Sequence, residues 1–100
     1  MQLYVIRRRN AWKSAEELEA AAARSKHVGD EEMPHEVRWI RSYVVDEGNG
    51  ELGTVCIYEA VSPEAIRKHA ERAGLPADEI SPVLDTVLVR PDPVPAAAAS

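Results

Sequence analysis

The stretch that decides the fold is VCIYEAVSPEAIRKHAERAGLP, residues 55–76. Its first four residues form a β-branched and aromatic run that is typical of a strand. Ser62 stands where a helix N-cap belongs, and Pro63 suits the first helical position because that position needs no backbone donor. Gly74 suits a left-handed helix end, and Pro76 prevents the helix from continuing. The stretch therefore predicts a strand, a tight turn and a helix with both ends marked.

The residues just before this stretch predict a β-hairpin. Val37 to Asp46 is a long strand candidate, and strict alternation gives it two sides: Trp39, Arg41 and Tyr43 on one, Ile40, Ser42 and Val44 on the other. The segment EGNGELG, residues 47–53, contains three of the chain's five glycines and is typical of a hairpin turn. The strand from Thr54 to Glu59 then returns antiparallel to the first.

A further strand is expected on each side of this central part of the chain. Leu3 to Arg8 carry apolar side chains on both faces, which favours a strand that is covered on two sides. Ile80 to Arg90 form a last strand candidate, and Pro82 indicates that its first residues lie at a sheet edge or outside the ladder.

A second helix is expected between the first two strands. It begins at Ser14, where Glu17 completes a capping box, and it continues to His27. Residues 28–36 are expected to form a loop, with Gly29 stopping the helix.

The predicted order of these segments is β-α-β-β-α-β. Right-handed crossovers and a hairpin between the middle strands then give a four-stranded antiparallel sheet with both helices on one face. We therefore predict an α+β protein with the ferredoxin-like split β-α-β fold. Residues 1–90 are expected to form this single domain, and the proline- and alanine-rich tail, residues 91–100, is expected to be disordered.

Composition excludes several classes of protein. The net charge is −5, and the only cationic cluster, residues 7–9, is explained as well by an exposed strand end as by a phosphate site, so nucleic acid is a poor partner. The lone Cys56 favours a reducing compartment. No signal peptide is visible, and no apolar run approaches the ~20 residues of a membrane span. We expect a soluble cytoplasmic protein that does not bind membranes.

Two helices leave the other face of such a sheet without cover. Four of the five aromatic residues fall on its strands, and by alternation most of them are expected on the uncovered face: Tyr4, Trp39, Tyr43 and Tyr58, with Arg41 and Cys56 nearby. Burying about 100 Å² of each of four such side chains is worth roughly 10 kcal/mol. This face therefore predicts a homodimer that packs sheet against sheet. The alternative is that a bulge shifts the alternation, which would make these rings ordinary core residues.

Three runs of sequence point to a family. VRWIRSYVV (37–45), CIYEAVSPEAIRKHA (56–70) and AGLPADEIS (73–81) resemble the small bacterial proteins grouped as nickel-binding, ferredoxin-like proteins. The similarity extends over residues 3–89, although the hairpin loop 47–53 and the tail look longer than usual for the family. The resemblance implies a ferredoxin-like homodimer that binds nickel at its surface.

Candidate nickel ligands follow from this resemblance and from ligand chemistry, since nickel prefers imidazole and then carboxylate. His69 and Glu59 match positions of the family's motif, and His35 lies in an acidic loop that can hold a divalent ion weakly. Each also has a structural explanation: His69 as a half-exposed residue hydrogen-bonded to a carboxylate, His35 as part of a solvated loop. His27 is explained by the helix dipole and Cys56 by burial. No metal-binding spacing such as H-x-x-x-H occurs, so any site would be assembled across the fold or across a dimer.

The sequence therefore leaves three kinds of function open. The first is nickel binding for sequestration or buffering by a homodimer. The second is a small-molecule-binding protein or enzyme of the dimeric α+β barrel type, with a pocket lined by Trp39, Arg41, Tyr43 and Tyr58. The third is an interaction module whose sheet face or edge strand binds a partner chain.

Overall fold

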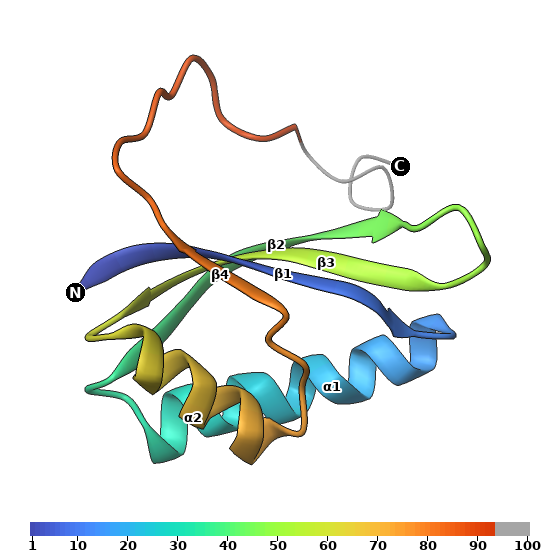
Figure 1. Cartoon of the computed structure of the whole chain (residues 1–100), viewed down its shortest axis with the longest axis horizontal. Coiled ribbons are helices and arrows are strands. Elements are labelled where there is room, and N and C mark those ends of the chain that lie inside the picture. The colour runs from blue at the N-terminus through green and yellow to red at the C-terminus, as the bar shows by residue number, and fades with distance from the viewer. Residues whose placement is uncertain (94–100) are drawn as a thin grey trace.

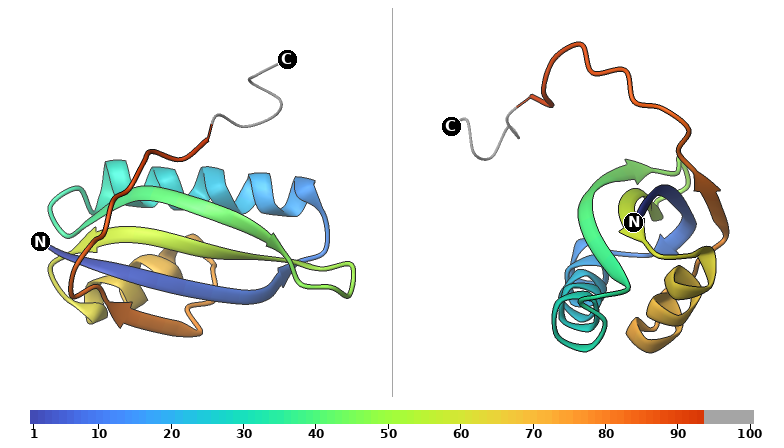
Figure 2. Two further views of the ribbon diagram at one scale, coloured as in Figure 1. Left: turned by 90° about the horizontal axis from the view of Figure 1, so that it is seen from above. Right: turned by 90° about the vertical axis from the view of Figure 1, so that its left-hand side faces the viewer.

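The chain folds in the predicted order β-α-β-β-α-β, in a computed structural model that describes residues 1–93. The successive segments are β1 (Gln2–Trp12), α1 (Ala15–His27), the short π-helical turn η1 (Val28–Glu32), β2 (Val37–Asp46), β3 (Leu52–Ala60), α2 (Pro63–Ala73) and β4 (Glu79–Pro82). The strands form one antiparallel sheet in the order β2-β3-β1-β4. Both helices lie on the same face of this sheet (Figures 1 and 2). The predicted α+β fold of the ferredoxin-like type is confirmed.

Helix α2 has the two ends that the sequence predicts. Ser62 Oγ accepts a hydrogen bond of 3.1 Å from the Ala65 amide at the start. At the other end Gly74 has a φ of +71°, and the Leu75 amide donates to the Ala70 carbonyl at 2.8 Å. Between these ends the helix buries Ile66, His69, Ala70 and Ala73 against the sheet, together with Ala65.

Helix α1 begins and ends at the predicted residues, but the helical path of the chain continues past Gly29. Ser14 Oγ accepts from the Glu17 amide at 3.2 Å, which caps the start. The expected stop at Gly29 is wrong, because the chain continues through the wide turn η1, which the Met33 amide closes on the Val28 carbonyl at 2.9 Å. Val28 and Met33 are both buried in the core, and this burial holds the segment against the sheet in place of a loop.

Strand β1 is longer than predicted. The chain continues past Arg8 as an irregular part of the strand, in which Asn10 has a φ of +49° and the register with β3 shifts before Trp12. The shift turns Trp12 into the interior, where its ring is buried.

The expected set of side chains on the uncovered face is only partly right: Arg41 and Tyr43 lie there, but Trp39 does not, because β2 contains a bulge. The register with β3 shifts between Trp39 and Arg41, so that Trp39 pairs with Tyr58 and Ser42 pairs with Cys56. Because Ile40 is an extra residue in β2, the alternation of side chains between the two faces is reversed after it. Trp39 and Ser42 consequently lie on the helix side, whereas Arg41 and Tyr43 lie on the open side. Tyr4, Cys56 and Tyr58 point to the helix side from β1 and β3 and are buried in the core, so the expected face is wrong for these three residues as well.

Strand β4 is much shorter than the predicted Ile80–Arg90. Its register pairs Glu79 with Arg7 and Pro82 with Tyr4, and the Val83 amide then donates to the Leu3 carbonyl. Since Leu3 lies next to the first residue of β1, the pairing between the two strands ends there. Residues 84–93, here called the strap, then arch over the open face of the sheet (Figure 1). The strap ends against β2, where the Tyr43 hydroxyl donates to the Asp92 carboxylate at 2.8 Å. The rest of the tail predicted to be disordered, residues 94–100, lies outside the described residues.

Candidate functional site

A cavity of about 300 Å³ lies between α1 and the helix side of the sheet. Side chains from β1, α1, β2 and β3 surround it, and Leu75 contributes from the segment after α2. Its wall is almost entirely apolar, and both tryptophans of the chain, Trp12 and Trp39, belong to it. The Trp39 ring stacks on Tyr58 with 6.1 Å between ring centroids. A concave apolar space with a few polar groups is typical of a small-molecule site.

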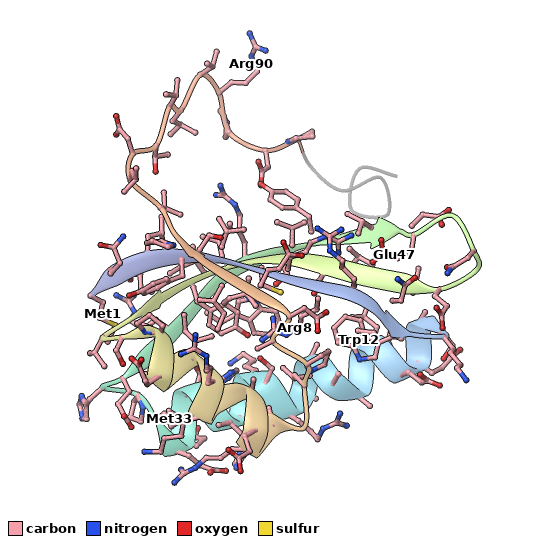
Figure 3. All side chains as sticks on the ribbon, in the orientation of Figure 1. Met1, Arg8, Trp12, Met33, Glu47 and Arg90 are labelled. Carbon is pink, nitrogen blue, oxygen red and sulfur yellow. The ribbon has the colours of Figure 1, made fainter. Side chains whose placement is uncertain are left out.

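Arg8 is the unusual residue of this cavity. Its side chain points from β1 to the helix side, like Tyr4 and Ile6 before it, and it is 1% exposed (Figure 3). Within the described part of the chain its guanidinium donates one hydrogen bond, from Nε to the Pro76 carbonyl at 2.7 Å, and Nη2 has no partner. The guanidinium also lies 5.7 Å from the centroid of the Tyr58 ring. No carboxylate within residues 1–93 forms a salt bridge with it, so a buried charge remains without a counter-ion.

Sequence reasoning missed Arg8 because it considered residues 7–9 together as one exposed cluster. The three arginines in fact have different environments. Arg7 bonds to Glu47 at 2.7 Å on the open side, and Arg9 pairs with Glu79 at 2.6 Å in solvent. Alternation with Ile6 was the signal that could have placed Arg8 inside the protein.

Beside the cavity, three polar side chains form a buried network. The Ser25 and Tyr58 hydroxyls are 2.7 Å apart, and His69 Nε2 lies 3.0 Å from the Ser25 carbonyl. Because a carbonyl only accepts, Nε2 carries the hydrogen and the unpartnered Nδ1 carries the lone pair. Burial and, to a lesser degree, the Arg8 charge lower the pKa of His69, against the Ser25 hydrogen bond, so this imidazole is neutral near pH 7. Burial likewise raises the pKa of Tyr58.

The structure does not bring the predicted metal ligands together. His69 is fully buried and bonds to a backbone carbonyl, not to a carboxylate, while Glu59 lies on the opposite side of β3 and pairs with Arg38 at 3.1 Å. His35 is exposed in the turn before β2, and His27 lies 3.6 Å from Glu32 on the surface. In residues 1–93 no three His, Cys, Asp or Glu side chains are grouped to hold a metal ion. These residues therefore do not fit a nickel centre formed by one chain.

The residues predicted to line one pocket are also divided between the two faces. Trp39 and Tyr58 line the cavity, whereas Arg41 and Tyr43 face the open side, where Arg41 lies 3.7 Å from Asp92. Tyr4 belongs to the core. The cavity thus lies under α1, not at the expected sheet-to-sheet interface. None of the helices in the described range has both the length and the apolar character required to cross a bilayer.

A four-stranded antiparallel sheet with two helices on one face defines this chain as a small ferredoxin-like α+β protein. It belongs to the SCO4226-like family of nickel responsive proteins, whose family model matches residues 4–83, so the resemblance seen in the sequence is confirmed. Among solved structures, the crystal structure of SCO4226 from Streptomyces coelicolor A3(2) matches with a TM-score of 0.69 and 24% identity, over 85% of this chain and 99% of that one. At this identity the likeness supports the fold. No curated protein matches the chain.

Proposed function

We propose that this protein binds nickel as a homodimer and serves to sequester or buffer the metal. The observation that carries the proposal is the match of a nickel responsive family model to residues 4–83. Ligand chemistry is consistent with it, because His27 and His35 offer exposed imidazoles and acidic side chains surround both. The neutral but buried His69 is a poorer candidate than the sequence suggests, since it would have to leave the core.

Dimerisation is supported by the apolar surface that a single chain leaves exposed. Half-buried aliphatic side chains line the open face of the sheet, namely Leu3, Val5, Val55 and Ile57. Above them the strap carries four large aliphatic residues, of which Leu84 is 95% and Val87 is 88% exposed, with Leu88 and Val89 only slightly less so. Apolar patches of this kind mark sites of association. A second copy of the chain is the partner that fits best, because its own open face offers the same apolar surface.

The two parts of the proposal use different surfaces, because His27 lies in the helix layer and the dimer is expected through the open face of the sheet (Figure 1). Within residues 1–93 one chain groups fewer than three potential ligands, and a nickel ion usually takes more than two protein ligands or completes its shell with water. A site with so few protein ligands would complete its coordination shell with water.

The test is a calorimetric titration of nickel into the protein without a histidine tag, together with the double substitution of His27→Ala and His35→Ala. We expect saturable binding in the unsubstituted protein and its loss in the double variant. Glu59→Gln is the companion variant, because Glu59 is already paired with Arg38. Absence of saturable heat in the unsubstituted protein would overturn nickel binding. Unchanged heat in the double variant would overturn the choice of ligands.

A second candidate function is small-molecule binding or catalysis in the cavity under α1. The observation in its favour is the apolar cavity of about 300 Å³ with Arg8, Tyr58 and Ser25 in its wall. It replaces the pocket expected between two sheets. Quenching of Trp12 and Trp39 by an apolar compound would support this candidate, since both rings line the cavity.

A further inference from the structure

We propose that the cavity under α1 binds a small apolar carboxylate, and that the Arg8 guanidinium is its anchor. The proposal rests on the second candidate function and adds the chemical class of the ligand. It assigns a role to the one buried charge of the described core that the nickel proposal does not use.

Arg8 is a buried charge that lacks a full set of partners. A charge removed from water is costly unless another charge or several hydrogen bonds compensate it. Arg8 has the Pro76 carbonyl and the face of Tyr58, but Nη2 has no partner and no carboxylate within residues 1–93 pairs with the side chain. Nη2 is not accessible from the cavity in this structure, so an anion that entered the cavity would become its partner once the guanidinium turned toward it.

The other polar groups of the cavity wall already form hydrogen bonds with each other. Ser25 bonds to Tyr58 at 2.7 Å, Trp39 Nε1 donates to Ser42 Oγ at 2.8 Å, and Cys56 Sγ donates to Thr54 Oγ1 at 3.3 Å. Glu19 also lines the cavity, but it is an exposed residue of α1 and forms no ion pair with Arg8. The cavity therefore offers one buried positive charge within a wall of rings and methyl groups.

A carboxylate matches this wall better than a phosphate does. One guanidinium balances one carboxylate, whereas a phosphate would bring a second negative charge into an apolar wall. The planar guanidinium also presents adjacent N–H donors in the geometry that a carboxylate accepts. A volume of about 300 Å³ is at the small end of ligand sites, so the body of the ligand is an aryl or short alkyl group.

The experiment uses the two tryptophans as reporters, because both line the cavity and the chain has no others. The probes are 4-phenylbutanoate and its neutral counterpart 4-phenylbutanamide, each titrated at pH 7 and followed by tryptophan fluorescence. We expect saturable quenching by both, with the carboxylate binding at least ten times more tightly. Arg8→Met should abolish that difference. Arg9→Met is the matched control, since it removes the same charge from an exposed residue and should preserve the difference.

The outcomes separate this inference from the function on which it rests. Equal binding of the two probes by the unsubstituted protein would overturn the anchor role of Arg8 and leave the cavity as an apolar binding site. No binding of either probe would overturn both. This comparison needs no variant, so it holds even if Arg8→Met does not fold. Ala22→Leu, which fills the cavity from α1, should abolish binding of both probes, whereas Ala20→Leu on the exposed side of α1 should not.

Discussion

His69 shows how one buried side chain links the helices to each other. It extends from α2 to the Ser25 carbonyl on α1, three residues before the wide turn η1 begins. Its ring also meets the edge of the Tyr58 ring, with 5.3 Å between centroids. The imidazole thus serves the packing of the core while it remains neutral.

This neutrality predicts a pH-dependent stability. Burial lowers the pKa of His69 from its ordinary value of 6.5, so the unfolded chain binds a proton more readily than the folded one. The contribution of His69 is fully present above pH 6.5 and is lost as the pH falls from there toward the lowered folded-state pKa. The free energy of unfolding, measured by urea denaturation at a series of pH values, should therefore fall below pH 6.5.

His69→Gln isolates this effect, because glutamine retains an N–H donor for the Ser25 carbonyl but does not titrate. Its stability should change less with pH in that window than that of the unsubstituted protein. His35→Gln, at an exposed position, should keep the original pH dependence. If His69→Gln showed the same pH slope as His35→Gln, another group would be responsible.

Gly53 gives a second prediction at a single position. A Cβ atom there would lie 2.6 Å from the Arg8 carbonyl oxygen and 2.8 Å from Arg7 Nη1. Since the carbonyl belongs to the neighbouring strand, it cannot move without disturbing the sheet. Gly53→Ala should lower the free energy of unfolding by about 1–3 kcal/mol.

Gly29→Ala is the matched control for this substitution. At Gly29 the nearest atom to an added Cβ is His69 Nε2 at 3.7 Å, an ordinary contact, and φ is not positive. Thermal or urea denaturation should find Gly29→Ala neutral or slightly stabilising. Equal losses in the two variants would contradict the steric explanation.

The helices and strands that could be predicted from the sequence are those with local signals. Helix α2 carries its N-cap, its first-turn proline and its terminal glycine within residues 62–74, and β2 follows the predicted bounds Val37–Asp46. Strand β4 was predicted too long because its length depends on its register with β1, which is a property of the pair and not of either segment.

The candidate site was less predictable than the fold. Trp39 and Tyr58 were recognised as site residues, but both were assigned to the wrong side of the sheet. For Trp39 the reason is the bulge at Ile40, which has no signature in the sequence, and for Tyr58 it is that alternation alone does not say which side of β3 the helices cover. Arg8 was missed since a charged residue is normally exposed, and only its pairing within the sheet shows that it is buried. The separation of His69 from Glu59 could not be predicted either, because it depends on which side of β3 carries the Glu59 side chain and which side α2 covers.

Within residues 1–93, the sheet has one face that both helices cover and one open face that only the strap crosses. We expect dimerisation through the latter, and the strap residues Val87 and Leu88 give the means to test it. Fully burying one such side chain is worth about 1.5–3 kcal/mol, so Val87→Ser combined with Leu88→Ser should weaken association more than tenfold. Light scattering over a range of protein concentrations measures this change.

Val61→Ser is the control for that experiment. Val61 is 57% exposed and apolar, but it lies in the turn before α2, away from the open face. It should leave the mass unchanged at every concentration. A monomeric mass for the unsubstituted protein at high concentration would rule out the dimer.

The bulge in β2 has one more consequence. β2 is one of the two edge strands of the sheet, and a free edge can accept a strand from another molecule. Ile40 interrupts the regular spacing of backbone groups there, and two charged side chains, Arg38 and Arg41, flank the interruption. The same bulge that turns Trp39 inward therefore disfavours the edge-to-edge pairing of β2 with other chains that leads to fibrils.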